Sequence, residues 1–141
     1  MSLASAIYEQ IEGANNNING HRDKITDFKN KKTKLKKARG IIKDNKSEIS
    51  DEKRNAHKKL SDFKNWKGSN YDNYEELVAG DLIEGYRAYS SDLDDIIDEI
   101  SDAISRLDHK ISDHNDVIDQ IRNLISALYD DLANLVEEEE E

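Results

Sequence analysis

The sequence contains no cysteine and no proline among its 141 residues, and each absence removes a class of structure or chemistry. Without cysteine the chain cannot form disulfides, a thiol nucleophile or a cysteine-based zinc site. Without proline it lacks the residue that most strongly interrupts a helix, at a cost of about 3 kcal/mol in a helix interior. Long uninterrupted helices are therefore open to this chain.

Long apolar runs and catalytic motifs are also missing. No stretch is long and apolar enough to predict a transmembrane helix, and the opening MSLASAIYEQ lacks the basic and apolar regions of a secretory signal. We find no glycine-rich phosphate loop, no H-E-x-x-H and no G-x-S-x-G. The acidic run from Asp92 to Asp95 spreads around a helix, which indicates a solvated face. We therefore expect no enzymatic activity, no cofactor and no metal.

Heptad spacing is the dominant pattern that is present. Apolar residues recur at alternating steps of three and four, which is typical of helices that pack along a seam. One such stripe runs through the first half, and two neighbouring stripes run through the second half. The stripes are Ile7, Ala14, His21, Phe28, Leu35, Ile42, Ile49, Ala56 and Phe63; Ile97, Ile104, Ile111, Ile118, Ile125 and Leu132; and Leu93, Ile100, Leu107, His114, Ile121, Leu128 and Leu135.

These stripes predict an all-α fold, a long antiparallel two-helix hairpin forming one domain over residues 1–141. We expect a first arm over about 4–65, a turn at 66–70, a second arm over about 71–136 and a frayed acidic tail at 137–141. Residues 13–20 (GANNNING) are poor helix formers, so a weak helix is expected there. Gly80 and Gly85 weaken the start of the second arm.

Folding the chain at Gly68 brings the stripes of the two arms together in one register. In that register Ala56 lies opposite Ala79, and His21 lies opposite His114. The histidines form either a polar layer that fixes the register or a two-histidine site for a metal or proton, and we favour the polar layer. The predicted intramolecular core is Ile18, Ile25, Phe28, Leu35, Ile42, Leu93, Ile100, Leu107, Ile111 and Ile118.

Charge divides between the two arms. Residues 1–68 carry a net charge of +8, whereas residues 69–141 carry −18. Opposite charges favour antiparallel pairing of the arms, although the basic cluster from Lys31 to Lys37 leaves nucleic-acid binding open. Four cations also occupy seam positions of the first arm, where their aliphatic stems can lie along the partner helix. They are Lys32, Arg39, Lys46 and Lys53.

The second arm carries a third apolar stripe that a two-helix hairpin cannot cover. It consists of Leu82, Tyr89, Ile96, Ala103, Val117 and Leu124. We predict that Leu82, Tyr89, Ile96, Val117 and Leu124 bind a helical partner, either another protein or a second copy of the chain. Pairing of this kind produces a four-helix bundle.

The tripeptide Trp66-Lys67-Gly68 between two heptad-bearing arms resembles the WXG turn of helical-hairpin proteins of type VII secretion. The long lysine-rich first arm is similar to that of the small helical accessory proteins encoded beside LXG polymorphic toxins. The resemblance implies that Trp66 and Gly68 form the turn. It also implies a bacterial cytoplasmic protein that binds the helical N-terminal domain of a toxin, with or without export by type VII secretion.

The predicted function is therefore that of a protein-binding accessory or targeting chaperone of type VII secretion. Trp66 serves either as an anchor for the partner or as a plug at the end of the hairpin. Two alternatives stay open, namely a structural coiled-coil homodimer and a nucleic-acid binder that uses the basic arm. Steep loss of affinity with rising salt would distinguish the nucleic-acid binder.

Overall fold

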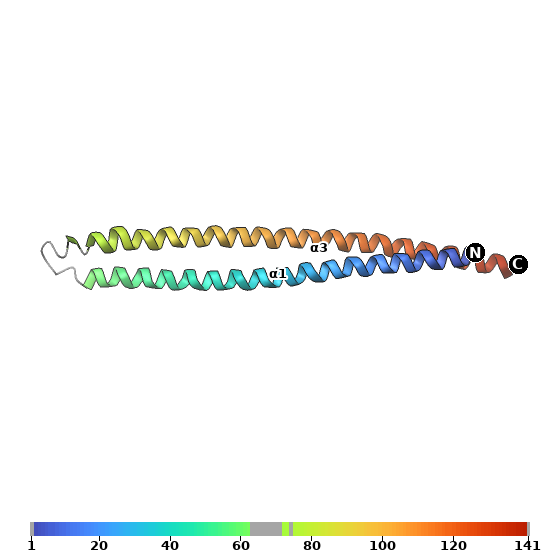
Figure 1. Cartoon of the computed structure of the whole chain (residues 1–141), viewed down its shortest axis with the longest axis horizontal. Helices are drawn as coiled ribbons and strands as arrows, with labels where there is room; N and C mark the ends of the chain where they lie inside the picture. The colour runs from blue at the N-terminus through green and yellow to red at the C-terminus, as the bar shows by residue number, and fades with distance from the viewer. Residues whose placement is uncertain (1, 63–71, 74, 141) are drawn as a thin grey trace. The chain divides into compact units, whose positions relative to one another are not determined.

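The computed structural model of the chain describes residues 2–62, 72–73 and 75–140, and every long element in it is helical. Helix α1 spans Leu3–Asp62, the π-helix η1 spans Glu76–Leu82, and helix α3 spans Ile83–Glu140. The two long helices pack against each other as a hairpin (Figure 1). The predicted all-α hairpin is confirmed, whereas the turn residues Trp66 and Gly68 lie outside the described residues.

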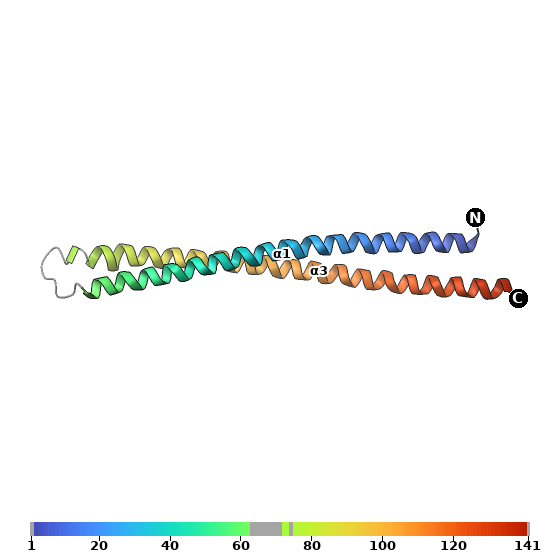
Figure 2. The ribbon, with the colours of Figure 1, turned by 90° about the horizontal axis from the view of Figure 1, so that it is seen from below.

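The contacts divide the chain into two compact units. One unit combines residues 1–33 with 105–141, and the other is residues 34–104. We call them the terminal unit and the central unit. Within each unit a segment of α1 lies beside a segment of α3 that runs in the opposite direction (Figures 1 and 2). Each unit therefore has its own stretch of seam.

Helix α1 begins where a serine satisfies the first free backbone amides. Ser2 accepts hydrogen bonds from the backbone amide of Ser5 on its Oγ and from that of Ala6 on its carbonyl oxygen, both at 3.1 Å. The helix then continues without a break through residues 13–20, where a weak helix was expected. Ile18, in the middle of this segment, is buried. Its packing offsets the low helix propensity of the surrounding asparagines and glycines.

The terminal unit holds a dense aliphatic core in two clusters. Ile7 and Ile11 of α1 pack with Leu128 and Leu132 of α3. Further along, Ile18 and Ile25 pack with Ile118, and partly buried Ile111, Ile121 and Ile125 surround them. These residues follow the three-and-four spacing of a coiled-coil seam on both helices. Burial of these side chains supplies the main stabilisation of the unit.

The central unit has a thinner seam. Ile83, Leu93 and Ile104 of α3 are buried, whereas Leu35 and Ile42 of α1 are half-buried. The reason lies in the sequence of α1, because Arg39 and Lys46 take seam positions that a coiled coil normally gives to aliphatic residues. Of the other predicted core residues, Phe28, Ile100, Leu107 and Ile111 are half-buried.

The start of the second arm differs from the prediction. The described residues 72, 73 and 75 are α-helical, close to the predicted start at about residue 71, but η1 follows them and α3 begins only at Ile83. A π-helix has more residues per turn than an α-helix, so it rotates the residues before Ile83 out of the heptad phase. Ala79 is consequently exposed, and the predicted placement of Ala79 on the seam opposite Ala56 is wrong.

The two other helix boundaries are close to those expected. The described part of α1 ends at Asp62, three residues before the predicted end of the first arm. Helix α3 continues through Glu140, so residues 137–140 of the acidic tail extend the helix instead of fraying from about residue 137. The tail keeps its helical form even though carboxylates at a helix C-terminus oppose the helix dipole.

Candidate protein-binding surface

The histidine pair lies on the seam of the terminal unit. The Nδ1 atoms of His21 and His114 are 2.7 Å apart, and the ring of Phe28 lies 5.6 Å from that of His114, centroid to centroid. At this distance one imidazole donates a hydrogen bond to the other, so one Nδ1 carries the hydrogen and the other accepts. Among the described residues no group of three or more metal-ligating side chains occurs. The two imidazole rings meet across the seam of the terminal unit.

Polar contacts link the two helices along one flank. In the central unit Arg39 donates to the hydroxyl of Ser101 at 3.1 Å, and Lys46 forms an ion pair with Asp94. In the terminal unit Lys32 is 2.5 Å from the carboxylate of Asp108. We letter the heptads a to g so that Lys32, Arg39 and Lys46 occupy position a of α1 and Ile97 and Ile104 occupy position a of α3. The three partners then all occupy position e of α3. In the central unit, the seam cations Arg39 and Lys46 therefore turn their charged ends toward the position-e flank of α3.

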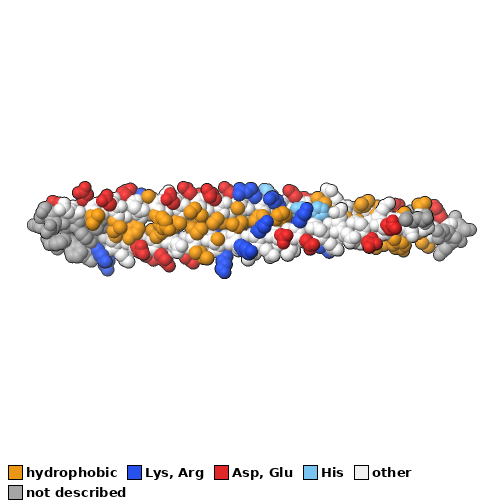
Figure 3. All heavy atoms as spheres, in the orientation of Figure 1, with side chains coloured by type: hydrophobic (Ala, Val, Ile, Leu, Met, Phe, Trp, Pro, Cys, Tyr) orange, Lys and Arg blue, Asp and Glu red, His pale blue; other side chains and the backbone are white. Residues whose placement is uncertain are grey.

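The opposite flank of the central unit carries exposed apolar side chains. Position g of the second arm, which immediately precedes each a residue, holds Leu82 at the end of η1 and Tyr89 and Ile96 in α3. These residues are 42%, 52% and 41% exposed. Position c of α1 on this flank holds Ile41, which is 53% exposed. Figure 3 shows hydrophobic side chains gathered in a strip along this part of the molecule. We define the apolar strip as Ile41, Leu77, Leu82, Tyr89 and Ile96.

A hollow of about 700 Å³ continues the apolar strip toward η1. Leu77 and Leu82 line it together with Tyr86 of the seam, and Ala56 contributes from α1. The hollow is open to solvent and most of its lining is apolar. An apolar concavity in line with an exposed strip is the surface expected for a protein partner.

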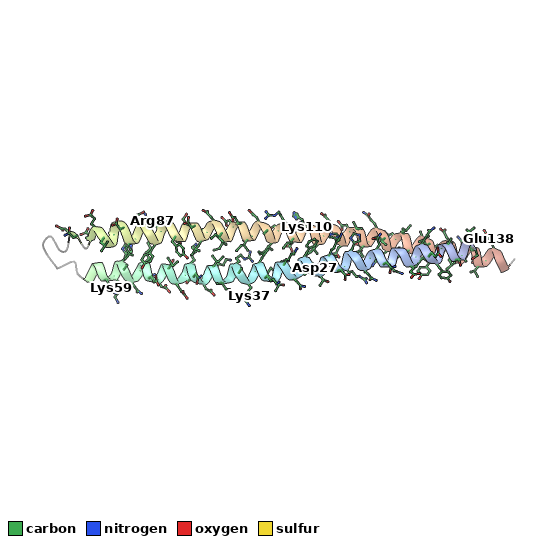
Figure 4. All side chains as sticks on the ribbon, in the orientation of Figure 1. Asp27, Lys37, Lys59, Arg87, Lys110 and Glu138 are labelled. Carbon is green, nitrogen blue, oxygen red and sulfur yellow. The ribbon has the colours of Figure 1, made fainter. Side chains whose placement is uncertain are left out.

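A second hollow, of about 240 Å³, lies on the flank of the ion pairs and has a different character. Lys53, Arg87 and Asp94 line it, with Ser90 between them. Arg87 also forms an ion pair with Glu84 at 2.9 Å (Arg87 is labelled in Figure 4). The central unit thus presents one flank of mixed, mutually paired charges and one flank that is apolar.

Two predicted partner-binding residues belong to the terminal unit. Val117 is half-buried and Leu124 is 54% exposed. The structure therefore divides the predicted stripe between the two units, with Leu82, Tyr89 and Ile96 in the central one. The turn residues Trp66 and Gly68, also predicted to contribute, lie outside the described residues.

Two members of the apolar strip were not predicted. Ile41 precedes the seam residue Ile42, and only one of two adjacent helix residues can face the seam, so its exposure could have been inferred. Leu77 lies within η1, whose shift of phase the heptad spacing does not reveal. No described helix is long and apolar enough to cross a membrane.

A family model described as YwqH-like matches residues 9–130, which is most of the chain and covers most of α1 and α3. No curated protein and no solved structure matches the chain.

Proposed function

The chain belongs to the YwqH-like family, and we propose that it is a protein-binding accessory that packs against a helical partner. The observation that carries the proposal is the apolar strip. Tyr89 and Ile96 of α3 are exposed, whereas Leu93 and Ile104 of the same helix are buried in the seam. A helix with apolar residues outside its own seam is typical of a larger bundle.

We further propose that the partner is the helical N-terminal domain of an LXG-type toxin and that the process is type VII secretion. The support for this is the resemblance of Trp66-Lys67-Gly68 between two heptad-bearing arms to the WXG arrangement. The hairpin fold and the family match are consistent with it. In this proposal the accessory holds the toxin's helical domain for presentation, acts by binding and has no catalytic role.

The basic arm gives less support to nucleic-acid binding. Lys32 and Lys46 are engaged with carboxylates of α3, so part of the positive charge is neutralised within the hairpin. Lys37 projects from α1 away from α3 (Figure 4). The helix that packs against α1 in the same unit, α3, is nevertheless rich in carboxylates. A duplex would have to approach this net negative protein against its field.

The test is coexpression of the full chain with helical toxin domains encoded by neighbouring genes, followed by size-exclusion chromatography with light scattering. We expect a complex of defined stoichiometry that persists in 0.5 M salt, because apolar contacts dominate it. Recovery of both proteins as separate species with every such domain would refute the proposal.

Tyr89 and Tyr129 offer a matched pair of substitutions for this test. Both are tyrosines of α3 with 52% exposure, but only Tyr89 belongs to the apolar strip. We expect Tyr89→Asp to weaken the complex at least about tenfold, since it buries a carboxylate at the interface. Tyr129→Asp should leave the complex unchanged. Equal effects of the two substitutions would show that the strip is not the contact surface.

A further inference from the structure

We infer that the helix which covers the apolar strip is amphipathic with lysine or arginine along both edges of its apolar face. This inference rests on the proposed function and specifies the chemistry of the partner. It comes from the charged residues that border the strip. Heptad positions c and g of both helices form this flank and hold both strip residues and the charged residues beside them. They can be read along 41–55 of α1 and along 82–103 of η1 and α3.

The borders of the strip carry carboxylates from both helices. Glu48 and Glu52 lie on the α1 side, and Asp92 and Glu99 lie on the α3 side; all four are exposed. Asp81 joins Glu52 in lining the hollow that continues the strip. No lysine or arginine occupies position c or g within 41–55 or 82–103. Lys59 also lines the hollow, and Lys34 lies at position c one heptad before Ile41, so the acidic borders are limited to these two segments.

The cations of the same α1 segment lie on the other flank. Lys43 and Arg54 occupy positions e and b, and the seam cation Lys46 turns to Asp94 at position e. The α1 segment 41–55 thus carries both positive and negative side chains. Only its flank beside the apolar strip is purely acidic. A partner helix on the strip meets an apolar floor between two acidic edges.

This arrangement selects the partner by charge as well as by apolar contact. An acidic or neutral amphipathic helix would leave these carboxylates unpaired or opposed, whereas a helix with basic edges pairs them. The three g residues from Leu82 to Ile96 span about 21 Å of helix, so three heptads of a partner helix are enough to cover them. A second copy of the chain would bring Glu48, Glu52 or Asp92 of its own strip against these edges if the strips faced each other.

The probes for the test are three synthetic 21-residue peptides of equal leucine content. One has a leucine stripe with lysine edges, one has the same stripe with glutamate edges, and one has the lysine composition in scrambled order. Binding to the full chain is measured by fluorescence anisotropy in 0.15 M salt. We expect the lysine-edged peptide to bind at least about tenfold more tightly than the other two, and Tyr89→Asp to weaken its binding by disrupting the apolar contact.

A matched pair of charge reversals separates local from bulk electrostatics. Asp92→Lys with Glu99→Lys changes the edges of the strip, whereas Asp95→Lys with Asp98→Lys changes two exposed carboxylates of α3 at positions f and b by the same total charge. We expect the first variant to prefer the glutamate-edged peptide and the second to keep the wild-type preference. Circular dichroism verifies that both variants keep the wild-type helix content.

Several results would overturn the inference. Equal binding of the scrambled and striped lysine peptides would reduce the effect to net charge, and so would equal effects of the two charge reversals. A dimer of the free chain that Tyr89→Asp converts to a monomer would assign the strip to a second copy. If a natural helical partner binds through Tyr89 but ignores the Asp92→Lys, Glu99→Lys variant, the inference fails while the proposed function stands.

Discussion

Truncation of Ile18 and of Ile96 to alanine should separate the seam from the apolar strip by their effects on stability. The two residues have the same side chain on long helices, but Ile18 is 5% exposed and Ile96 is 41% exposed in the free chain. Ile18 packs in a cluster with Ile25 and Ile118. Its truncation removes buried methyl groups and leaves a cavity, whereas Ile96→Ala mostly shortens a side chain that already contacts water.

The magnitudes follow from this difference in burial. Isoleucine-to-alanine changes in cores cost about 2–5 kcal/mol. None of the described residues is less than 2% exposed, so the seam can relax around the gap and we expect about 2–3 kcal/mol for Ile18→Ala. About half of the Ile96 side chain is already in water, which limits its cost to about 1 kcal/mol or less.

Urea unfolding followed by circular dichroism at 222 nm measures both values. For a dependence of about 2 kcal/mol per M, the midpoint should fall by roughly 1–1.5 M for Ile18→Ala and by at most about 0.5 M for Ile96→Ala. The measurement is made at low micromolar concentration, where light scattering verifies the mass of one chain. A loss for Ile96→Ala equal to that for Ile18→Ala would mean that the strip is buried in the free protein, and the reasoning would be refuted.

Three further stability predictions concern the polar seam positions and one glycine. Replacing both Arg39 and Lys46 by leucine should raise the free energy of unfolding by about 1–3 kcal/mol, because exposed ion pairs contribute at most about 1 kcal/mol and leucine buries more apolar area. A lower melting temperature in calorimetry would contradict this. Replacing His21 and His114 together by leucine should lower the free energy of unfolding by less than the sum of the two single replacements, since each single change leaves an imidazole without its partner. A thermodynamic double-mutant cycle measures this coupling, and additive values would exclude it. Gly20→Ala should stabilise α1 by about 0.5–1 kcal/mol, because an added Cβ meets no atom within 4 Å; urea titration tests it, and destabilisation would be the contrary result.

The hairpin was predictable because its seam repeats in both arms. Every predicted core residue lies on a helix and is buried or half-buried, since a strict alternation of three and four leaves one face for the partner arm. The register also places His21 opposite His114, which the structure joins at 2.7 Å. The exposure of Leu82, Tyr89 and Ile96 follows from the same spacing, because position g lies beside the seam and not on it.

What the sequence did not predict depends on local geometry that periodicity cannot detect. The wrong placement of Ala79 on the seam opposite Ala56 assumed an unbroken α-helix, and a single π-helical turn is enough to rotate it away. The direction in which Arg39 and Lys46 turn was also hidden, because flexible side chains at position a can reach either flank. That choice decides which flank stays apolar, and it becomes visible only when the partners Ser101 and Asp94 are located.

The π-helix η1 has a consequence for how the chain tolerates changes in its length. A π-helical turn accommodates one residue more than an α-helical turn, so deleting Gly80 can be absorbed by converting η1 to an α-helix. The seam from Ile83 onward would keep its register, because the adjustment is complete before the helix α3 begins. In relatives of this chain, single-residue gaps in an alignment should therefore collect between residues 76 and 82.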